Sequence, residues 1–409
     1  MPPEKTFVIV GASLAGAKAA ATLRDEGFGG RIVLLGEEPV RPYERPPLSK
    51  AYLRGEAGFD DAAVFDAEYY ESHDIELRTS TVVTLLDHKA KEVELASGER
   101  ISFDRLLLTT GAAPRRLSVP GAELPGVLYL RSVADSDAIH EHIAAETPIV
   151  VIGAGWIGAE VAASARQLGA PASVVDMASV PLERVLGSEV GAVYRDLHAA
   201  HGVDFRLGTG IKAIEGAGAV GGVRLTDGAV LPAGAVVVGI GVAPRTELAE
   251  AAGLTVDNGV VTDEYFATSA PDVFAAGDVA NVRHPLYDAR VRLEHWSAAL
   301  NQGPAAARNM LGTKTPYDKT PYFFSDQYDL GMEYRGWAPG FDQVVLRGDP
   351  AGGEFLAFWL QAGRVLAAMN ANVWDQGDTL DALVRARPSV DPSRLADPGV
   401  DLAALVTGT

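Results

Sequence analysis

Cysteine is absent from this 409-residue chain, and this absence excludes several kinds of protein. Without cysteine there is no disulfide framework, no thiolate zinc site, no cysteine-ligated iron–sulfur cluster and no redox-active dithiol. Basic residues are also scarce, because 35 Lys and Arg stand against 54 Asp and Glu, a formal net charge of −19. This charge argues against binding to nucleic acid or to anionic membranes.

Long apolar runs are missing as well. No stretch approaches the ~18 consecutive apolar residues of a membrane span, and the first residues do not resemble a secretory signal. We therefore expect a cytoplasmic protein that is not associated with a membrane. Apolar residues nevertheless make up 47% of the chain and glycine occurs 44 times. At ~100–200 residues per domain, this length and composition predict two to four α/β domains.

A βαβ pattern occurs twice, first from Phe7 to Glu37 and again from Ile149 to Asp176. Each copy has an apolar strand, a glycine turn, an alanine-rich helix and a second apolar strand. Strands without polar alternation are typical of parallel sheets covered by helices on both faces. The repeat predicts an α/β fold with two Rossmann-like dinucleotide-binding domains.

Four short segments between the two copies alternate in polarity and predict a small antiparallel sheet. They are residues 75–77, 81–85, 92–95 and 101–103. A parallel strand is expected at 105–109, and a similar order of strands follows the second copy. From Thr320 aromatic residues cluster, strands alternate, and a final helix is expected around 379–387. This last region predicts a separate C-terminal α+β domain.

The second copy carries the motif Gly153-Ala-Gly155-Trp-Ile-Gly158 between its strand and its helix. The first glycine permits a tight turn, the second lets a pyrophosphate approach the backbone, and the third lets the helix pack on the sheet. The helix N-terminus adds free N–H groups for the phosphates. Asp176 ends the next strand, where a carboxylate accepts ribose hydroxyls and repels a 2′-phosphate. This pattern favours NADH over NADPH.

The first copy departs from the motif at its middle position, with Gly11, Ser13 and Gly16. Serine adds a small side chain near the pyrophosphate but also a hydroxyl donor, so nucleotide binding is still expected. Glu37 ends the following strand and takes the role of the ribose-binding acid. FAD is the natural redox partner of NADH, so a second dinucleotide loop suggests an FAD site.

Two further stretches support an FAD site. Val273 to Asp278 reads as a strand that ends in Gly-Asp, where the carboxylate suits a flavin ribitol hydroxyl and a following helix start would present amides to the pyrophosphate. The loop from Arg41 to Lys50 is fixed by prolines and carries three cations, Arg41, Arg45 and Lys50.

Taken together, seven segments resemble the oxygenase-coupled, FAD-containing NADH–ferredoxin reductases over essentially the whole chain. These segments are GASLAG, RPYERPPLSK, LLLTTGAAPR, VVIGAGWIGAE, VFAAGDVA, LEHWSAALNQG and PYFFSDQYD. The resemblance implies the glutathione-reductase-like flavoprotein fold. It implies an FAD-binding domain at residues 1–113 and 242–319, an inserted NADH-binding domain at 114–241, and a C-terminal interface domain at 320–409.

The resemblance also implies roles for individual residues. The FAD-binding set is Gly11, Ser13, Gly16, Glu37, Arg45, Lys50, Thr110, Gly111, Asp278 and Trp296. The NADH-binding set is Gly153, Gly155, Gly158, Glu160 and Asp176. Glu160 is implied to lie near the nicotinamide, paired with Lys50 close to flavin N5, and these two are the expected catalytic residues. No metal site is expected. The chain departs from the family at Phe324, where a tryptophan is common.

The implied reaction passes electrons from NADH through FAD to a [2Fe–2S] ferredoxin, which serves a cytochrome P450 or a ring-hydroxylating oxygenase. Because the chain has no cysteine, electrons cannot pass to a protein thiol and must leave the flavin directly. An acidic ferredoxin would need a local basic patch on this acidic chain. The candidate arginines are Arg283, Arg290, Arg292, Arg308 and Arg335. Two alternatives remain open: a rubredoxin or other small-acceptor reductase, and an NADH-sensing flavoprotein resembling apoptosis-inducing factor.

Overall fold

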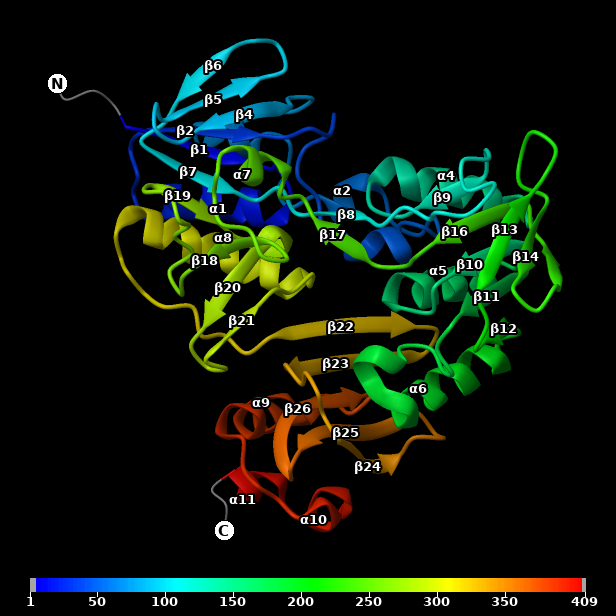
Figure 1. Cartoon of the computed structure of the whole chain (residues 1–409). Helices are drawn as coiled ribbons and strands as arrows, with labels where there is room; N and C mark the ends of the chain where they lie inside the picture. Colours follow the sequence, from blue (N-terminus) through cyan, green and yellow to red (C-terminus); the bar gives the residue numbers. More distant parts are fainter. Residues whose placement is uncertain (1–4, 407–409) are drawn as a thin grey trace. The chain divides into compact units, whose positions relative to one another are not determined.

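The computed structural model describes residues 5–406, and these form two compact units (Figure 1). The first unit contains residues 5–44, 59–113 and 242–319. The second unit contains residues 45–58, 114–241 and 320–406. The segment 45–58 therefore belongs to the second unit, although the chain reaches it directly from the first βαβ copy.

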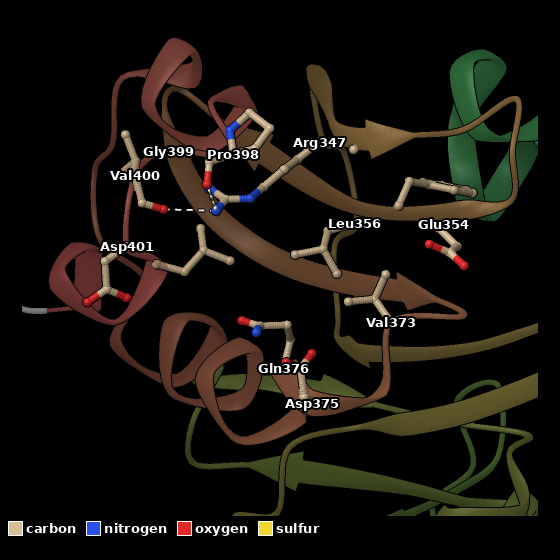
Figure 2. A pocket seen from close by; sticks show the side chains of 13 residues that line it. Arg347, Glu354, Leu356, Val373, Asp375, Gln376, Pro398, Gly399, Val400 and Asp401 are labelled. Atoms are coloured by element: carbon tan, nitrogen blue, oxygen red, sulfur yellow. Dashed lines mark hydrogen bonds between the residues drawn. The ribbon is translucent and has the colours of Figure 1, made fainter.

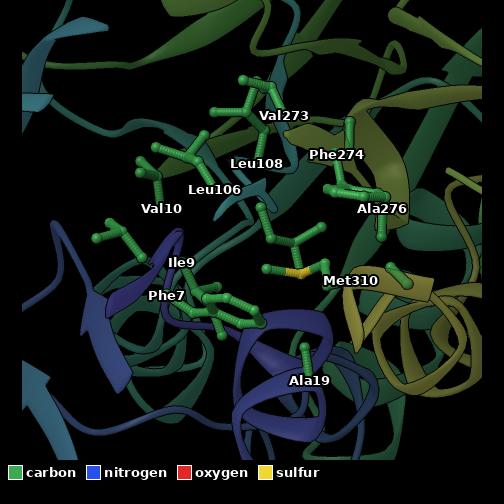
Figure 3. Packing of buried hydrophobic residues seen from close by; sticks show 14 of the residues in the cluster. Phe7, Ile9, Val10, Ala19, Leu106, Leu108, Val273, Phe274, Ala276 and Met310 are labelled. Atoms are coloured by element: carbon green, nitrogen blue, oxygen red, sulfur yellow. The ribbon is translucent and has the colours of Figure 1, made fainter. Parts of the chain in front are cut away.

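A parallel five-stranded sheet forms the centre of the first unit, in the order β19-β7-β1-β2-β3. The strands are β1 (Thr6–Val10), β2 (Arg31–Leu35), β3 (Ile75–Arg78), β7 (Arg105–Leu108) and β19 (Val273–Ala275). The helices α1 (Leu14–Asp25) and α8 (Trp296–Leu311) pack against each other. Figure 3 shows Phe7 and Ile9 of β1 beside Ala19 of α1 and Met310 of α8 in the buried core.

Three smaller sheets complete the first unit. Strands β4, β5 and β6 form an antiparallel sheet, β18, β20 and β21 form a mixed one, and β8 pairs with β17. Their bounds are β4 (Val83–Asp87), β5 (Glu92–Leu95), β6 (Arg100–Ser102), β8 (Ala112–Pro114), β17 (Val242–Pro244), β18 (Val260–Thr262), β20 (Ala280–His284) and β21 (Ala289–Val291). The short helices are α2 (Phe59–Ala62), α3 (Tyr69–Ser72), α7 (Glu247–Ala251) and the 3₁₀ turn η2 (Gly277–Val279).

A second parallel sheet, β12-β11-β10-β16-β9, lies in the second unit. Its strands are β9 (Val127–Tyr129), β10 (Ile149–Ile152), β11 (Ala172–Asp176), β12 (Asp204–Leu207) and β16 (Ala235–Val238). The helices here are the 3₁₀ turn η1 (Pro46–Ser49), α4 (Val133–Ala144), α5 (Trp156–Gln167) and α6 (Glu183–Ala200). A small antiparallel sheet joins β13 (Ile211–Glu215), β14 (Gly222–Leu225) and β15 (Val230–Pro232).

The C-terminal part of the second unit is an antiparallel five-stranded sheet, β22-β23-β26-β25-β24, followed by short helices (Figure 1). The strands are β22 (Tyr322–Gln327), β23 (Leu330–Gly336), β24 (Gln343–Asp349), β25 (Glu354–Gln361) and β26 (Arg364–Ala371). The helices are the 3₁₀ turn η3 (Trp374–Gln376), α9 (Gly377–Ala386), α10 (Pro392–Ala396) and α11 (Leu402–Val406). The predicted fold, two Rossmann-like α/β regions and a C-terminal α+β region, is confirmed.

Two details of the prediction are wrong. Residues 75–77 belong to β3, a parallel strand at the edge of the first large sheet, and not to the antiparallel sheet. An edge strand is only partly covered, so its side chains alternate in polarity as antiparallel strands do. In addition, Asp278 is followed by strand β20 and not by a helix, because Ala280 to Val282 pair with β18.

Candidate functional site

The glycine loop of the second unit is shaped by close backbone approaches. Gly153 has a φ of +101°, and a Cβ there would lie 2.3 Å from the carbonyl oxygen of Gly239. A Cβ on Gly158 would lie 1.9 Å from the carbonyl oxygen of Gly153. At Gly155 no atom lies within 4 Å of the corresponding position. Gly153 and Gly158 are therefore required by the packing of the backbone, whereas Gly155 leaves open space beside the loop.

Helix α5 begins at this open space without a side-chain cap, because Gly155 is its N-cap residue. By contrast, Ser132 and Asp135 form a capping box at the start of α4. The first N–H groups of an uncapped helix are free to bind an anion, and the helix dipole favours one. This geometry fits the pyrophosphate of a dinucleotide.

Asp176 lies at the end of β11 and contacts the glycine loop. Its Oδ2 accepts the backbone N–H of Ala154 at 2.6 Å, and its Oδ1 accepts that of Ala178 at 2.8 Å. A carboxylate has about four acceptor positions, so it can still accept ribose hydroxyls. The sequence predicts a ribose contact for Asp176 but does not show that its carboxylate also holds the glycine loop.

The glycine loop of the first unit has the same backbone shape. Gly11 has a φ of +116° and approaches Thr109, whose hydroxyl donates to the Gly11 carbonyl at 2.8 Å. A Cβ on Gly16 would lie 2.1 Å from the Gly11 carbonyl oxygen. Ser13 is the N-cap residue of α1, yet its side chain makes no capping hydrogen bond. The start of α1 thus offers free N–H groups and a hydroxyl donor to a phosphate.

Arg245 joins three of the expected FAD-site residues. Its guanidinium pairs with the Glu37 carboxylate at 2.7 Å, its carbonyl accepts the Thr110 hydroxyl at 2.8 Å, and its N–H donates to the Gly111 carbonyl at 2.9 Å. Sequence reasoning missed Arg245. The available signal was the repeated turn Ala-Pro-Arg, which occurs after Gly111 and again after Gly241.

Asp278 and Trp296 also lie in the first unit. Asp278 is half-buried in η2, and its carbonyl accepts an N–H of Arg292 at 3.3 Å. Trp296 opens α8, and its indole N–H donates to the Glu44 carboxylate at 2.9 Å. The preceding His295 has its pKa lowered to about 4 by burial, against an opposing effect of the Asp278 charge.

In the second unit, Lys50 and Glu160 form an ion pair, with Nζ 2.8 Å from Oε2. The Glu160 side chain is 6% exposed and the Lys50 side chain 13% exposed. The Ser49 hydroxyl donates to Glu160 Oε2 at 2.5 Å, and the Ser325 hydroxyl donates to Oε1 at 2.7 Å. Sequence reasoning paired Lys50 with Glu160 but missed both serines. Both serines lie in segments that carry the resemblance, because Ser49 directly precedes Lys50 and Ser325 is the first residue of Ser-Asp-Gln.

The Arg45 guanidinium donates a hydrogen bond to the carbonyl of Arg131 and not to a member of this ion pair. Phe324, where the chain departs from the motif that the resemblance implies, has its ring centroid 5.7 Å from Lys50 Nζ. A cation at this distance over an aromatic face is favoured electrostatically. The neighbouring Phe323 packs in the core against Trp156, with ring centroids 4.9 Å apart.

The five candidate arginines for ferredoxin docking are all engaged within the chain. Four of them form ion pairs: Arg283 with Asp288, Arg292 with Glu294, Arg308 with Glu26, and Arg335 with Glu333. Arg290 donates to the carbonyls of Thr262 and Asn281. The positive charge of the four paired arginines is therefore offset by a neighbouring carboxylate, whereas Arg290 contacts neutral carbonyls.

A cavity of about 480 Å³ lies in the C-terminal part of the second unit (Figure 2). Arg347 borders it, but its guanidinium donates to the carbonyls of Pro398 and Val400 and so fixes the last segment of the chain. None of the predicted site residues lines this cavity.

Within residues 5–406, no helix combines the length and apolar character needed to cross a bilayer, and no cluster of potential metal ligands occurs.

Residues 5–303 match the family model of the pyridine nucleotide-disulphide oxidoreductases, and residues 322–406 match the model described as reductase C-terminal. The chain belongs to the pyridine nucleotide-disulphide oxidoreductase family. It is 40% identical to rhodocoxin reductase of Rhodococcus erythropolis, over 97% of this chain and 93% of that protein.

Two other members of the family are similar over almost their whole length. The ferredoxin–NAD(+) reductase component of the anthranilate 1,2-dioxygenase system of Burkholderia cepacia is 40% identical, over 97% of this chain and 98% of that one. The reductase in the covalent putidaredoxin reductase–putidaredoxin complex superposes with a TM-score of 0.94 at 38% identity, over 99% of this chain and 98% of that one. The resemblance inferred from the motifs is confirmed.

Proposed function

We propose that this protein is an FAD-dependent NADH–ferredoxin reductase that passes electrons one at a time to a [2Fe–2S] ferredoxin of a cytochrome P450 or ring-hydroxylating oxygenase system. The observation that carries the proposal is similarity along the full chain, C-terminal region included, to ferredoxin reductases named for dioxygenase systems and for a CYP system. The lack of cysteine supports it, because the chain has no thiol that could carry the disulfide chemistry in the family's name.

FAD and NADH are the proposed cofactors. Bound FAD supplies a ring that takes a hydride's two electrons and releases them singly. In the first unit, the free N–H groups of α1 and the Ser13 hydroxyl would hold the FAD phosphates, and Glu37 the adenosine ribose. Asp278 and Trp296 would hold the ribitol and the pyrimidine edge. Residues 1–113 and 242–319 are the proposed FAD-binding domain, and within that range the segment 45–58 packs with the second unit.

In the second unit, residues 114–241 are the proposed NADH-binding domain. The N–H groups of α5 would bind the pyrophosphate beside Gly155, and the Asp176 carboxylate would accept ribose hydroxyls and repel a 2′-phosphate. Glu160 lies two residues after Gly158, within the first turns of α5. It would therefore lie at the nicotinamide end of the same site. The buried ion pair with Lys50 would then exclude water and orient the reacting ring.

We further propose that the protein acts in the cytoplasm and that residues 320–409 form an interface domain for the ferredoxin. Purification followed by anaerobic titration tests the function. The protein should be yellow, be bleached by NADH at far lower concentration than by NADPH, and be rapidly reoxidised by a [2Fe–2S] ferredoxin. Rapid reoxidation by rubredoxin alone would favour the small-acceptor reductase, and a long-lived reduced complex with NAD would favour the NADH sensor.

A further inference from the structure

A row of buried polar side chains reaches the Glu160 carboxylate from the C-terminal region of the second unit. Ser325 donates to Glu160 Oε1 at 2.7 Å, and Gln327 Nε2 donates to Ser325 Oγ at 3.1 Å. His198 of α6 lies behind them, with its Nε2 2.7 Å from Gln327 Oε1. Ser325 and Gln327 are each 1% exposed and His198 is fully buried. Ser325 and Gln327 lie two residues apart on β22, so they share one face of the strand.

The hydrogen-bond directions along this row are fixed by the chemistry of its members. Since the Gln327 amide nitrogen donates to Ser325, its oxygen must be the acceptor for His198, which donates from Nε2. Burial lowers the pKa of His198 to about 4, so the ring is neutral and its Nδ1 is an acceptor. The Tyr328 hydroxyl lies 3.4 Å from that atom. Every donor in the row therefore points toward Glu160.

This row of hydrogen bonds fixes the positions of the side chains and does not relay protons. A glutamine amide has separate donor and acceptor atoms, so a proton arriving at its oxygen cannot leave from its nitrogen without an unfavourable tautomer. The three donors to Glu160 also divide between its oxygens. Ser49 and Lys50 contact Oε2, whereas Ser325 contacts Oε1. Together they fix both the position of the carboxylate and the orientation of its plane.

We propose that Ser325 is a positioning residue for NADH oxidation: supported by Gln327 and His198, it fixes Glu160 Oε1 so that the Glu160–Lys50 pair keeps one geometry when the nicotinamide binds. This inference rests on the proposed function only in taking NADH as the electron donor, and it does not depend on ferredoxin. If wild-type flavin is not reduced by NADH, the proposed function fails, and the unfolding experiment below still tests the row.

The kinetic test is anaerobic stopped-flow reduction of the purified holoprotein by NADH. Misplacing a catalytic group by a fraction of an ångström costs on the order of tenfold in rate, so Ser325→Ala should lower the limiting rate constant about tenfold and change the NADH Kd less than about twofold. Ser325→Thr keeps the hydroxyl and should stay within about threefold of the wild type. Thr262→Val removes an equally buried hydroxyl in the first unit and should change neither quantity.

Two further variants show whether Ser325 acts through Glu160. In a Glu160→Gln background, Ser325→Ala should add less than about a twofold loss, because groups that act as one unit are not additive. Gln327→Met removes the support behind Ser325 and should slow reduction by roughly threefold. A limiting rate constant within twofold of the wild type for Ser325→Ala would overturn the proposal. An equal slowing by Ser325→Ala in both backgrounds would also overturn it.

Urea unfolding of the same holoproteins provides a readout that does not involve turnover. The shifts in unfolding midpoint caused by Ser325→Ala and Glu160→Gln should not be additive, whereas those of Thr262→Val and Glu160→Gln should be. Additive shifts for Ser325 and Glu160 would mean that the two side chains do not interact in solution, which would contradict the proposal.

Discussion

Asp176 Oδ2 lies 2.6 Å from the backbone nitrogen of Ala154, so the acid at the end of β11 also holds the glycine loop beside it. The same carboxylate is proposed to accept the ribose hydroxyls of NADH. One side chain therefore couples the shape of the pyrophosphate loop to the recognition of the sugar. Loss of this carboxylate should affect both.

Asp176→Ala should raise the NADH Kd by at least about tenfold, which corresponds to ~1.4 kcal/mol. It should also lower the free energy of unfolding by about 1–3 kcal/mol, because two loop N–H groups lose their acceptor. Flavin titration and urea unfolding measure the two effects. Asp204→Ala, on the neighbouring strand β12, removes an exposed carboxylate and should change neither. An unchanged NADH Kd in Asp176→Ala would contradict this assignment.

The glycine loop offers a pair of alanine substitutions with opposite expectations. Gly155→Ala meets open space in the free protein and should lower the free energy of unfolding by only about 1 kcal/mol, because alanine is a poorer N-cap residue than glycine. It should nevertheless weaken NADH binding at least about tenfold by crowding the pyrophosphate. Gly158→Ala places its Cβ 1.9 Å from the Gly153 carbonyl oxygen. It should destabilise the fold by several kcal/mol, on the order expected for overpacking. Equal effects of the two substitutions on stability would contradict this division of roles.

The buried Lys50–Glu160 pair should be required for rapid reduction of the flavin. Glu160→Gln and Lys50→Met should each lower the limiting rate constant by roughly 10- to 100-fold, because the reacting groups lose their alignment. The FAD content should stay at the wild-type level. Lys91→Met breaks a more exposed ion pair with Asp272 in the first unit and serves as the control. A wild-type reduction rate in Glu160→Gln would rule out a catalytic role for this pair.

His198 should make stability depend on pH. Its pKa is lowered to about 4 in the folded protein by burial, compared with an ordinary value near 6.5. The unfolded chain therefore binds a proton more readily, so the stability is fully present above about pH 6.5 and is lost as the pH falls toward 4. The loss from pH 7 to pH 5 should be on the order of 2 kcal/mol.

The variant His198→Gln keeps an amide donor for Gln327 but cannot titrate. The difference in the free energy of unfolding between pH 7 and pH 5 should therefore be smaller in this variant than in the wild type. Urea unfolding at both pH values measures it. An identical pH dependence would mean that His198 does not retain its neutral form in the folded protein at pH 5.

Much of this architecture could be predicted from local pattern. The two glycine loops specify their own turns, because Gly153 and Gly158 sit where a Cβ would collide with backbone. Asp176 ends β11 as the sequence predicts, whereas Glu37 lies two residues beyond the end of β2 at Leu35. Strand β3 was misassigned because alternation in a short edge strand does not distinguish parallel from antiparallel pairing.

The contacts that depend on residues far apart in sequence could not be predicted in the same way. Ser325 reaches Glu160 across 165 positions, and His198 reaches Gln327 across 129. Nothing local to Ser325 indicates that its hydroxyl faces a carboxylate, since serine in a half-buried strand is compatible with many environments. Similarly, the charges of the candidate arginines could be counted from the sequence, but their ion-pair partners appear only in the folded chain.

We propose that NADH reduces a flavin bound to this cysteine-free chain and that the flavin then returns its electrons singly to a [2Fe–2S] ferredoxin. Anaerobic double-mixing stopped flow tests it most directly: the holoprotein is first reduced with one equivalent of NADH and then mixed with an excess of oxidised ferredoxin. We expect two equivalents of ferredoxin to be reduced for each NADH consumed. A reduced flavin that persists in the presence of ferredoxin would contradict the account.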